Sequence, residues 1–407
     1  MSDPRPWVFC QLGAREHYIL PRAFERRGRL AALVTEAWVP PHAIAARIPG
    51  SLGRRFADRF APDLAASRVE AFTGAAIAFE LGVRLRREAP AAWPTILRRN
   101  AWFERHAVAR LQRARLLDER PVVFAYSYAA LGILQAAKAA GCTTVLGQID
   151  PAISEEDVVA GAVTRHAALQ PDWHRAPPQY WVRWREECAL ADHIVVNSPW
   201  ARDGLVKAGI DSTKLAVVPL AYEARPMLAR RPMPDRFSAV RPLRVLFLGS
   251  LGIRKGIAEV LEAASLLADA PVEFHLVGQS GIVFPADIVA NPKVRRHGSV
   301  SRGAAAGHYA AADVFVLPSH SDGFGLTQIE AQAHGLPLIA SRHCGAVVRD
   351  GVDGFLLDGV TASDIAAAVT RYLADPSLLA IQSAEAAASV ARFDPAVIGD
   401  RLAALVD

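Results

Sequence analysis

Short apolar segments alternate with segments of helical periodicity along most of the chain. In the first 220 residues the segments that read as strands are 7–12, 31–35, 122–125, 143–146, 193–196 and 215–218. Helical spacing fills intervals between them, for example 18–26 and 129–140. A strand that returns to its sheet through a helix is typical of parallel α/β folds. The first half therefore predicts one helix-covered parallel sheet, interrupted by a less regular insertion at about 154–178.

The alternation lapses between residues 222 and 242, where prolines and scattered arginines are typical of a linker. It then resumes, with strands expected at 244–248, 272–277, 314–317 and 336–341 and a helix at 256–267. We therefore expect two Rossmann-like domains, 1–222 and 223–384, with a C-terminal helical segment at about 385–407 that packs back on the first domain. Two such domains place a ligand in the cleft between them, at the carboxyl ends of the strands.

Composition excludes several classes of protein. The 407 residues are 52% hydrophobic and 21% charged, which excludes a disordered or low-complexity chain. A net charge of +5 without a recognition motif gives no reason to expect nucleic acid as a partner. The four cysteines are far apart and lack metal-ligand spacing, so we expect neither a disulfide scaffold nor a zinc ribbon. No segment reads as a signal peptide or a membrane span, and we expect a cytoplasmic protein.

The stretch 313–341 combines a strand, a glycine-rich loop and a helix. The loop reads Asp322-Gly323-Phe324-Gly325-Leu326. Glycines at such a turn let a ligand approach the backbone, and the N–H groups at the start of the helix favour phosphate. Glu330 lies on the otherwise apolar helix that follows. It either hydrogen-bonds ribose hydroxyls or faces solvent, and the residues alone leave both readings open.

A second glycine loop connects the strand at 244–248 to the next helix. It contains Gly249, Ser250, Arg254 and Lys255. A lysine at a helix start opposes the helix dipole, so a purely structural role explains it poorly. Lysine is also rare in this chain, with five among 46 lysines and arginines. These observations favour an ammonium group aimed at a diphosphate over a solvated lysine.

Together the two loops resemble the donor-site signature of family 4 glycosyltransferases, which have the GT-B fold. The family pattern G-R-L-x-x-x-K-G is matched by Gly249-Ser250-Leu251 and by Lys255-Gly256. The pattern E-G-F-G, with a second glutamate eight residues after the first, is matched by 322–325 and Glu330. The resemblance is clear over about 190–360 and looser in the N-terminal half. It implies an α/β GT-B protein with two Rossmann-like parallel-sheet domains facing a central cleft.

The resemblance also implies a retaining glycosyltransferase that uses a UDP-, GDP- or ADP-sugar and needs no metal or other cofactor. Lys255 and the amides of 323–325 would stabilise the departing diphosphate. Asp322 would hold hydroxyls of the donor sugar, and Glu330 the ribose. These three side chains are the expected catalytic residues. The other expected donor contacts are Gly13, Gly249, Ser250, Arg254, Phe324 and Leu326. The fold leaves the acceptor open among glycans, lipid-linked sugars and small molecules.

Two departures from the family pattern keep alternatives open. Ser250 stands where the family usually has a diphosphate-binding arginine, and Asp322 is one methylene shorter than the usual glutamate. One alternative is a catalytically silent nucleotide-sugar-binding subunit of a polysaccharide synthesis complex. Another is a related GT-B enzyme that epimerises or phosphorolyses a sugar.

The acceptor side is less defined. Gly13 follows the first strand, and the resemblance places its loop near the donor diphosphate. In the same loop, Arg15 and His17 either touch phosphate or acceptor or lie in solvent. Asp150, at the end of another strand, faces the same cleft and is a further acceptor candidate.

A basic segment lies in the first half. Residues 84–120 hold ten arginines against four acids, a net charge of +6, with Trp93, Trp102 and Phe103 among them. Basic segments of this kind dock on anionic lipid, or they form a solvated helical face. The first reading predicts peripheral contact with the inner face of a membrane.

Overall fold

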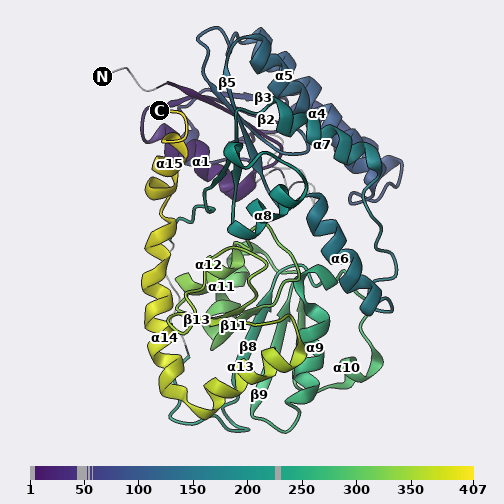
Figure 1. The fold of residues 1–407 in the computed structure, drawn as a ribbon, viewed down its shortest axis with the longest axis vertical. Helices are drawn as coiled ribbons and strands as arrows, with labels where there is room; N and C mark the ends of the chain where they lie inside the picture. The colour runs from purple at the N-terminus through teal and green to yellow at the C-terminus, as the bar shows by residue number, and fades with distance from the viewer. Residues whose placement is uncertain (1–4, 44–52, 54–55, 57, 225–230) are drawn as a thin grey trace.

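Two parallel sheets organise the described residues, which are 5–43, 53, 56, 58–224 and 231–407 of the computed structural model (Figure 1). The first sheet has the order β3-β2-β1-β4-β5-β6-β7. Its strands are β1 (Trp7–Gln11), β2 (Leu30–Thr35), β3 (Val69–Ala71), β4 (Val122–Tyr126), β5 (Thr143–Gln148), β6 (His193–Val196) and β7 (Leu215–Val217).

The second sheet has the order β10-β9-β8-β11-β12-β13. Its strands are β8 (Leu243–Leu248), β9 (Val272–Val277), β10 (Val294–Gly298), β11 (Val314–Leu317), β12 (Leu338–Ala340) and β13 (Gly354–Leu356). In both sheets the strand order reverses next to the first strand, which is where doubly wound folds bind ligands. The predicted fold of two Rossmann-like parallel-sheet domains is confirmed.

Helices cover both faces of the first sheet. Side chains alternate along β1, so that Val8 and Cys10 face one hydrophobic cluster while Trp7 and Phe9 face another. The cluster of Val8 includes residues of α3 (Thr73–Leu85), α4 (Trp93–Arg113), α5 (Leu131–Ala139), α7 (Pro178–Leu190) and α8 (Pro199–Lys207). The cluster of Trp7 includes α1 (Ile19–Glu25) and the last helix of the chain, α15 (Pro395–Ala403).

The second sheet has its own hydrophobic core. Strand β11 is completely buried in it, and most residues of β8 and β9 are buried there as well. The helices of this half are α9 (Ile257–Leu266), α10 (Ala286–Ala290), α11 (Arg302–Ala311), α12 (Thr327–Ala333), α13 (Ala362–Ala374) and α14 (Pro376–Ser389).

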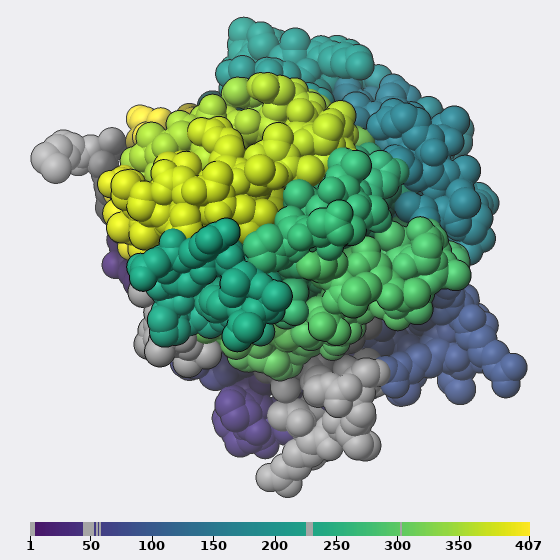
Figure 2. Space-filling model, turned by 90° about the horizontal axis from the view of Figure 1, so that it is seen from below, coloured from purple at the N-terminus to yellow at the C-terminus, as the bar shows by residue number. Residues whose placement is uncertain are grey.

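The C-terminal helices run along one side of the molecule from the second domain to the first (Figure 1). Figure 2 views the molecule from the end of the second domain, and the C-terminal helices, drawn in yellow, cover one side of that domain. Arg27, which follows α1, forms an ion pair of 2.7 Å with Asp400 of α15, and Arg29 forms one of 2.7 Å with Asp407. The end of the chain is therefore part of the first domain's surface.

Residues 154–178, which the sequence pattern left as an irregular insertion, contain helix α6 (Ile153–Arg165). This helix reaches from the first domain to the side of the second (Figures 1 and 2). Ala162 belongs to the core of the second domain, and the Gln170 side chain accepts a hydrogen bond of 3.0 Å from the Ile253 amide. Because α6 is buried mainly against another domain, its short apolar stripe is a weak sequence signal.

Candidate active site

Two neighbouring loops of the second domain build the core of the site. One follows β8 and the other follows β11, and these strands are adjacent in the sheet. The loops touch at Gly256, where an added Cβ would lie 2.0 Å from the carbonyl oxygen of Pro318. Gly256 also has a φ of +75°, which favours glycine. The sequence therefore allows both loops to reach the same point at the carboxyl edge of the sheet.

A cluster of three charges lies where the loops meet. The Asp322 carboxylate forms ion pairs with Lys255 through Oδ2 and with Arg254 through Oδ1, the latter at 3.0 Å. Burial by itself would raise the pKa of Asp322, but the two cations outweigh it and hold that pKa below its ordinary value. Asp322 is therefore a half-buried carboxylate between two cations, an arrangement that can bind both anionic phosphate and sugar hydroxyls.

Lys255 does not lie in the first turn of a helix, as the sequence pattern suggested. It ends a short 3-10 turn, η5 (Ile253–Lys255), and Gly256 separates it from α9. Its position is set by this turn and by Asp322. Ser250 is exposed, whereas Arg254 reaches the charge cluster. Arg254 therefore supplies a second cation in this loop, in which Ser250 replaces the family's arginine.

After Asp322, the glycine-rich loop is held by contacts of Phe324. Phe324 is buried in the core of the second domain, and its carbonyl accepts hydrogen bonds of 2.8 Å from the Gly345 amide and the Gln328 side chain. Gly325 has a φ of +76°, and Leu326 precedes the first turn of α12. The side chain of Phe324 therefore anchors the loop.

Glu330 lies on α12, outside the charge cluster of Asp322. Its Oε2 accepts a hydrogen bond of 2.9 Å from the hydroxyl of Tyr309 on α11. Its backbone carbonyl contacts the ring of His334 at 2.8 Å. Glu330 is thus half-buried, and the hydrogen bond from Tyr309 offsets part of the cost of burying its carboxylate. Its contact with ribose stays a prediction.

Side chains of the first domain contact the residues around the charge cluster, and sequence analysis did not single these side chains out. The Ser321 hydroxyl donates to Glu155 of α6 at 2.9 Å and accepts from the indole of Trp200 at 2.9 Å. Glu155 also lies 3.7 Å from Arg254. Burial raises the pKa of Glu155 to about 8. The positive charge of Arg254 opposes this rise, whereas the carboxylates of Asp150 and Asp322 add to it. No motif marks Glu155, because its role depends on how the domains pack.

Asp150 follows β5 and faces the same region. Its Oδ1 accepts hydrogen bonds from the Tyr128 hydroxyl, from the Gln148 side chain at 3.1 Å and from the Ala152 amide at 2.9 Å. Burial raises the pKa of Asp150, although these hydrogen bonds and the charges of Arg254 and Arg15 oppose the shift. The structure therefore brings the predicted acceptor candidate Asp150 close to the predicted donor residues.

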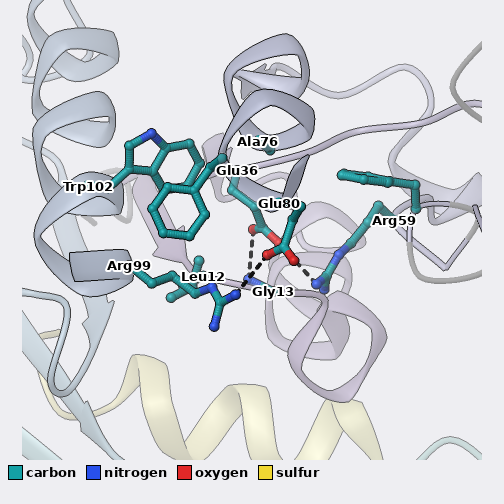
Figure 3. A pocket seen from close by; sticks show the side chains of 10 residues that line it. Leu12, Gly13, Glu36, Arg59, Ala76, Glu80, Arg99 and Trp102 are labelled. Atoms are coloured by element: carbon teal, nitrogen blue, oxygen red, sulfur yellow. Dashed lines mark hydrogen bonds and ion pairs between the residues drawn. The ribbon is translucent and has the colours of Figure 1, made fainter. Parts of the chain in front are cut away.

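The Gly13 loop lies beside a separate pocket of about 170 Å³ in the first domain (Figure 3). The Gly13 amide donates a hydrogen bond of 2.7 Å to Glu36, which also pairs with Arg59 at 3.0 Å. Across the pocket, Glu80 pairs with Arg99 at 2.9 Å. Each charged side chain labelled in Figure 3 thus has a partner of opposite sign. The amide of Gly13 is directed to Glu36 in this arrangement, so its diphosphate role stays a prediction.

The residues after Gly13 have an unusual backbone. Glu16, His17 and Tyr18 have φ values of +49°, +52° and +59°. Left-handed conformations cost free energy in residues other than glycine and concentrate at functional sites. Arg15 is exposed, with its guanidinium 5.2 Å from the centre of the Tyr126 ring. Burial raises the pKa of Glu16 to about 7, and sequence analysis did not single out this residue.

The basic segment 84–120 forms the end of α3, the loop after it and α4. Trp102 and Phe103 are buried in the first domain's core, so they are not available to a membrane. Exposed apolar side chains lie elsewhere, at Leu81 and Leu85, which are 46% and 84% exposed. Within the described ranges, no helix has both the length and the hydropathy that crossing a membrane requires.

The described side chains contain no group of three or more His, Cys, Asp or Glu arranged to hold a metal ion. Metal independence itself stays a prediction.

Known proteins resemble this chain in both sequence and fold. Residues 242–375 match the family model described as Glycosyl transferases group 1. The D-inositol 3-phosphate glycosyltransferase of Geodermatophilus obscurus is 34% identical over 244 residues, which cover 54% of this chain and 53% of the relative. That of Mycolicibacterium vanbaalenii is 30% identical over 256 residues, 56% of each chain. The chain spans about half the length of the curated relatives it matches.

Solved structures extend the likeness to the whole chain. Anabaena Alr3699/HepE in complex with UDP has a TM-score of 0.63 at 18% identity, covering 98% of this chain and 99% of that one. Sucrose-phosphate synthase from Thermosynechococcus elongatus has a TM-score of 0.66 at 18% identity, covering 98% of each chain. At these identities the likeness concerns the fold. The chain therefore has a region, 242–375, that matches Glycosyl transferases group 1, on the GT-B fold that it shares with these solved structures.

Proposed function

We propose that this protein is a retaining glycosyltransferase that moves a sugar from a nucleotide-diphosphate sugar to a glycan, lipid-linked or small-molecule acceptor. The observation that carries the proposal is the charge cluster of Lys255, Arg254 and Asp322 at the carboxyl ends of β8 and β11. This half-buried cluster lies next to Glu155 of the first domain.

The cations suit a leaving diphosphate. When the glycosidic bond to the nucleotide breaks, negative charge grows on the phosphate oxygens. A preorganised ammonium and guanidinium stabilise that charge without further reorganisation. Lys255 and Arg254 are preorganised by Asp322, since the same carboxylate holds both. Asp322 then accepts hydrogen bonds from hydroxyls of the transferred sugar, and Glu330 is assigned to the ribose.

The retaining outcome and the independence from metal rest on the resemblance of the two loops to the family pattern. In that mechanism the leaving phosphate takes the proton of the attacking hydroxyl on the same face of the sugar. It needs no pair of carboxylates of the kind that glycosidases use. A UDP-sugar is the first donor to test, because a protein of the same fold was solved with UDP.

Cytoplasmic location and contact with the inner membrane face are part of the same proposal. The exposed Leu81 and Leu85 lie beside Arg84, Arg86 and Arg87 at the end of α3. An apolar tip with basic neighbours suits an anionic lipid surface. It would bring the enzyme to a lipid-linked acceptor.

One experiment separates an active transferase from a silent binding subunit. Calorimetry with UDP, GDP, ADP and their glucose conjugates identifies the base, and release of nucleotide from the sugar conjugate in an acceptor panel measures turnover. Binding with acceptor-dependent release, and an α-linked product from an α-linked donor, support the proposal. Binding without turnover across the panel supports the alternative that the exposed Ser250 motivates, and binding of none of these nucleotides contradicts both.

A further inference from the structure

Glu259 is a buried carboxylate that the proposed function does not use. It lies in the first turn of α9, and its side chain is 5% exposed. Its Oε1 accepts a hydrogen bond of 2.7 Å from the ring of His320 and lies 3.3 Å from Nε2 of His166. Burial by itself would raise the pKa of Glu259, but the hydrogen bond and charge of His320 and the charge of His166 hold that pKa below its ordinary value. Glu259 therefore stays ionised in the protein interior, between two histidines.

The two histidines belong to different segments of the chain. His320 follows β11 and precedes Asp322 in the same loop. His166 follows α6, the helix that reaches from the first domain to the side of the second (Figure 1). One oxygen atom of Glu259 thus contacts both the Asp322 loop and the end of α6. Because α9 begins directly after the Lys255 loop, Glu259 links the two donor loops with each other and with the first domain.

His320 connects this carboxylate to the charge cluster by a short path. Its ring donates to Glu259, and its backbone amide donates a hydrogen bond of 2.9 Å to the carbonyl of Arg254. Further along the same loop, Asp322 pairs with the side chains of Arg254 and Lys255. A displacement of His320 would therefore move Asp322 relative to both cations.

The segment after α6 also contacts the Lys255 loop directly. The side chain of Gln170 accepts a hydrogen bond of 3.0 Å from the amide of Ile253, which opens the turn that Lys255 ends. His166 and Gln170 therefore contact the second domain from one short segment of the first. The position of the Lys255 loop depends on both domains.

Stability alone explains this buried pair poorly. Taking a carboxylate and a charged ring out of water costs free energy, and apolar side chains of similar volume often replace a buried ion pair without loss of stability. Ala258 and Val260, on either side of Glu259, are apolar and belong to the core of the second domain. What an apolar side chain cannot do is hold the ring of His320 in one orientation by a hydrogen bond of 2.7 Å.

We infer that Glu259 is a positioning residue of the donor site, which acts on the transferred sugar through His320 and Asp322. Its carboxylate holds the His320 ring. His320 in turn holds the Asp322 loop against the backbone of Arg254, and Asp322 accepts the sugar hydroxyls. The contact with His166 ties this arrangement to the first domain. The inference deepens the proposed function and rests on it, because it uses the assignment of Asp322 to the sugar.

Calorimetry with free UDP and with UDP-glucose tests this path; the GDP or ADP pair replaces them if the wild type selects that base. Glu259→Gln removes the charge but keeps the size of the side chain, and His320→Phe keeps a ring but removes its hydrogen bond. Each variant should bind UDP-glucose about tenfold more weakly, as expected for the loss of a hydrogen bond to a charged group, and free UDP within about twofold of the wild type. His297→Phe on the edge strand β10 is the matched control and should change neither affinity.

Two results with these variants would overturn the inference. Equal losses for UDP and UDP-glucose, together with a lower melting temperature, would show that the pair only stabilises the fold. Unchanged affinity for UDP-glucose in both variants would show that the pair does not position the site. His166→Phe should also weaken UDP-glucose severalfold, and an unchanged affinity in this variant would overturn the link to the first domain.

A double-mutant cycle shows whether His320 acts through Asp322. In an Asp322→Asn background, His320→Phe should cost less than about twofold in further affinity for UDP-glucose, because the carboxylate that it positions is already gone. Losses that multiply in full would show that the two residues act independently and would overturn the inference. A wild type that binds none of the nucleotides or their glucose conjugates contradicts the proposed function as well, so the two failures are distinguishable.

Discussion

Gly323 and Ile149 are in such close contact that no side chain fits between them. A Cβ on Gly323 would lie 1.8 Å from the carbonyl oxygen of Ile149, well below any real contact. Gly323 belongs to the loop that carries Asp322, and Ile149 precedes Asp150 at the end of β5. This contact sets the distance between the Asp322 loop of one domain and the Asp150 loop of the other.

Gly323→Ala should therefore push the two loops apart. A misplacement of about 1 Å at a reacting centre can cost about 10²-fold in rate, so we expect kcat/KM to fall by that order while each domain stays folded. Steady-state kinetics and the melting temperature measure the two effects. Gly307→Ala on α11 is the control, since no atom lies within 4 Å of its added Cβ. Unchanged kinetics in Gly323→Ala would show that this contact does not position the site.

Lys255→Ala should remove a preorganised cation from the leaving diphosphate. Loss of one such donor costs about 10²–10³ in kcat. The variant also leaves Asp322 with Arg254 as its cationic partner at 3.0 Å, so the loop keeps one of its two ion pairs. Turnover of the nucleotide sugar measures the loss, and Lys207→Ala at the exposed end of α8 is the matched control. Wild-type rate and donor affinity in Lys255→Ala would dismiss the assignment.

Asp322 and Glu330 should respond differently to loss of their charge. Glu330→Gln should weaken free nucleotide and nucleotide sugar alike, by roughly tenfold for one hydrogen bond to a charged group. Asp322→Asn should weaken only the nucleotide sugar, because Lys255 and Arg254 then lose a competing anion and still attract the diphosphate. Calorimetry with UDP and a UDP-sugar decides between these outcomes. Equal losses for free UDP in both variants would reverse or void the roles.

Tyr309→Phe separates a ribose contact from a structural one. It removes the hydroxyl that donates to Glu330 and leaves the carboxylate in place. If Glu330 binds ribose, nucleotide affinity should fall less in Tyr309→Phe than in Glu330→Gln. Equal losses of affinity and of melting temperature would indicate that the pair only stabilises α12 against α11.

Sequence alone predicted the two loops of the second domain that build the candidate site. The charge-free strand 314–317 and the glycines beside it predict a buried strand that ends at a ligand loop, and the spacing from Asp322 to Glu330 matches the family pattern. The missing parts depend on packing between domains. Ser321 and Glu155 are 166 positions apart, and no periodicity brings them together. Within the first domain, the hydrogen bond from Gly13 to Glu36 was missed for another reason: it requires β1 and β2 to pair in register.

Glu155 should make folding stability depend on pH. Its pKa is about 8 in the folded protein against an ordinary value of 4.5, so the fold favours the protonated form. Stability that this group contributes is present below about pH 4.5 and is lost as the pH rises to about 8. Relative to Glu155→Gln, the free energy of unfolding of the wild type should fall by up to about 1.4 kcal/mol for each pH unit of increase within this window. Denaturant unfolding at pH 5, 6.5 and 8 measures the difference, and a constant difference contradicts the burial of an ionisable Glu155.

Membrane contact, if it occurs, should depend on the end of α3 rather than on the aromatics of the basic segment. Trp102 and Phe103 are buried, whereas Leu81 and Leu85 are exposed beside several arginines. Each basic residue near an anionic leaflet contributes about 1 kcal/mol, and salt screens this attraction. We expect the protein to sediment with anionic vesicles at low salt, and to do so less at high salt or with neutral lipid.

Replacing Leu81 and Leu85 with Gln should lower the bound fraction severalfold, because their apolar surface no longer enters the lipid. Leu266→Gln is the matched control, since this leucine is 62% exposed but lies at the end of α9 in the other domain. If the wild type stays in the supernatant with anionic vesicles at low salt, the basic segment is a solvated face. The acceptor is then a soluble molecule, because an enzyme that does not reach the lipid surface meets lipid-linked sugars too rarely to use them efficiently.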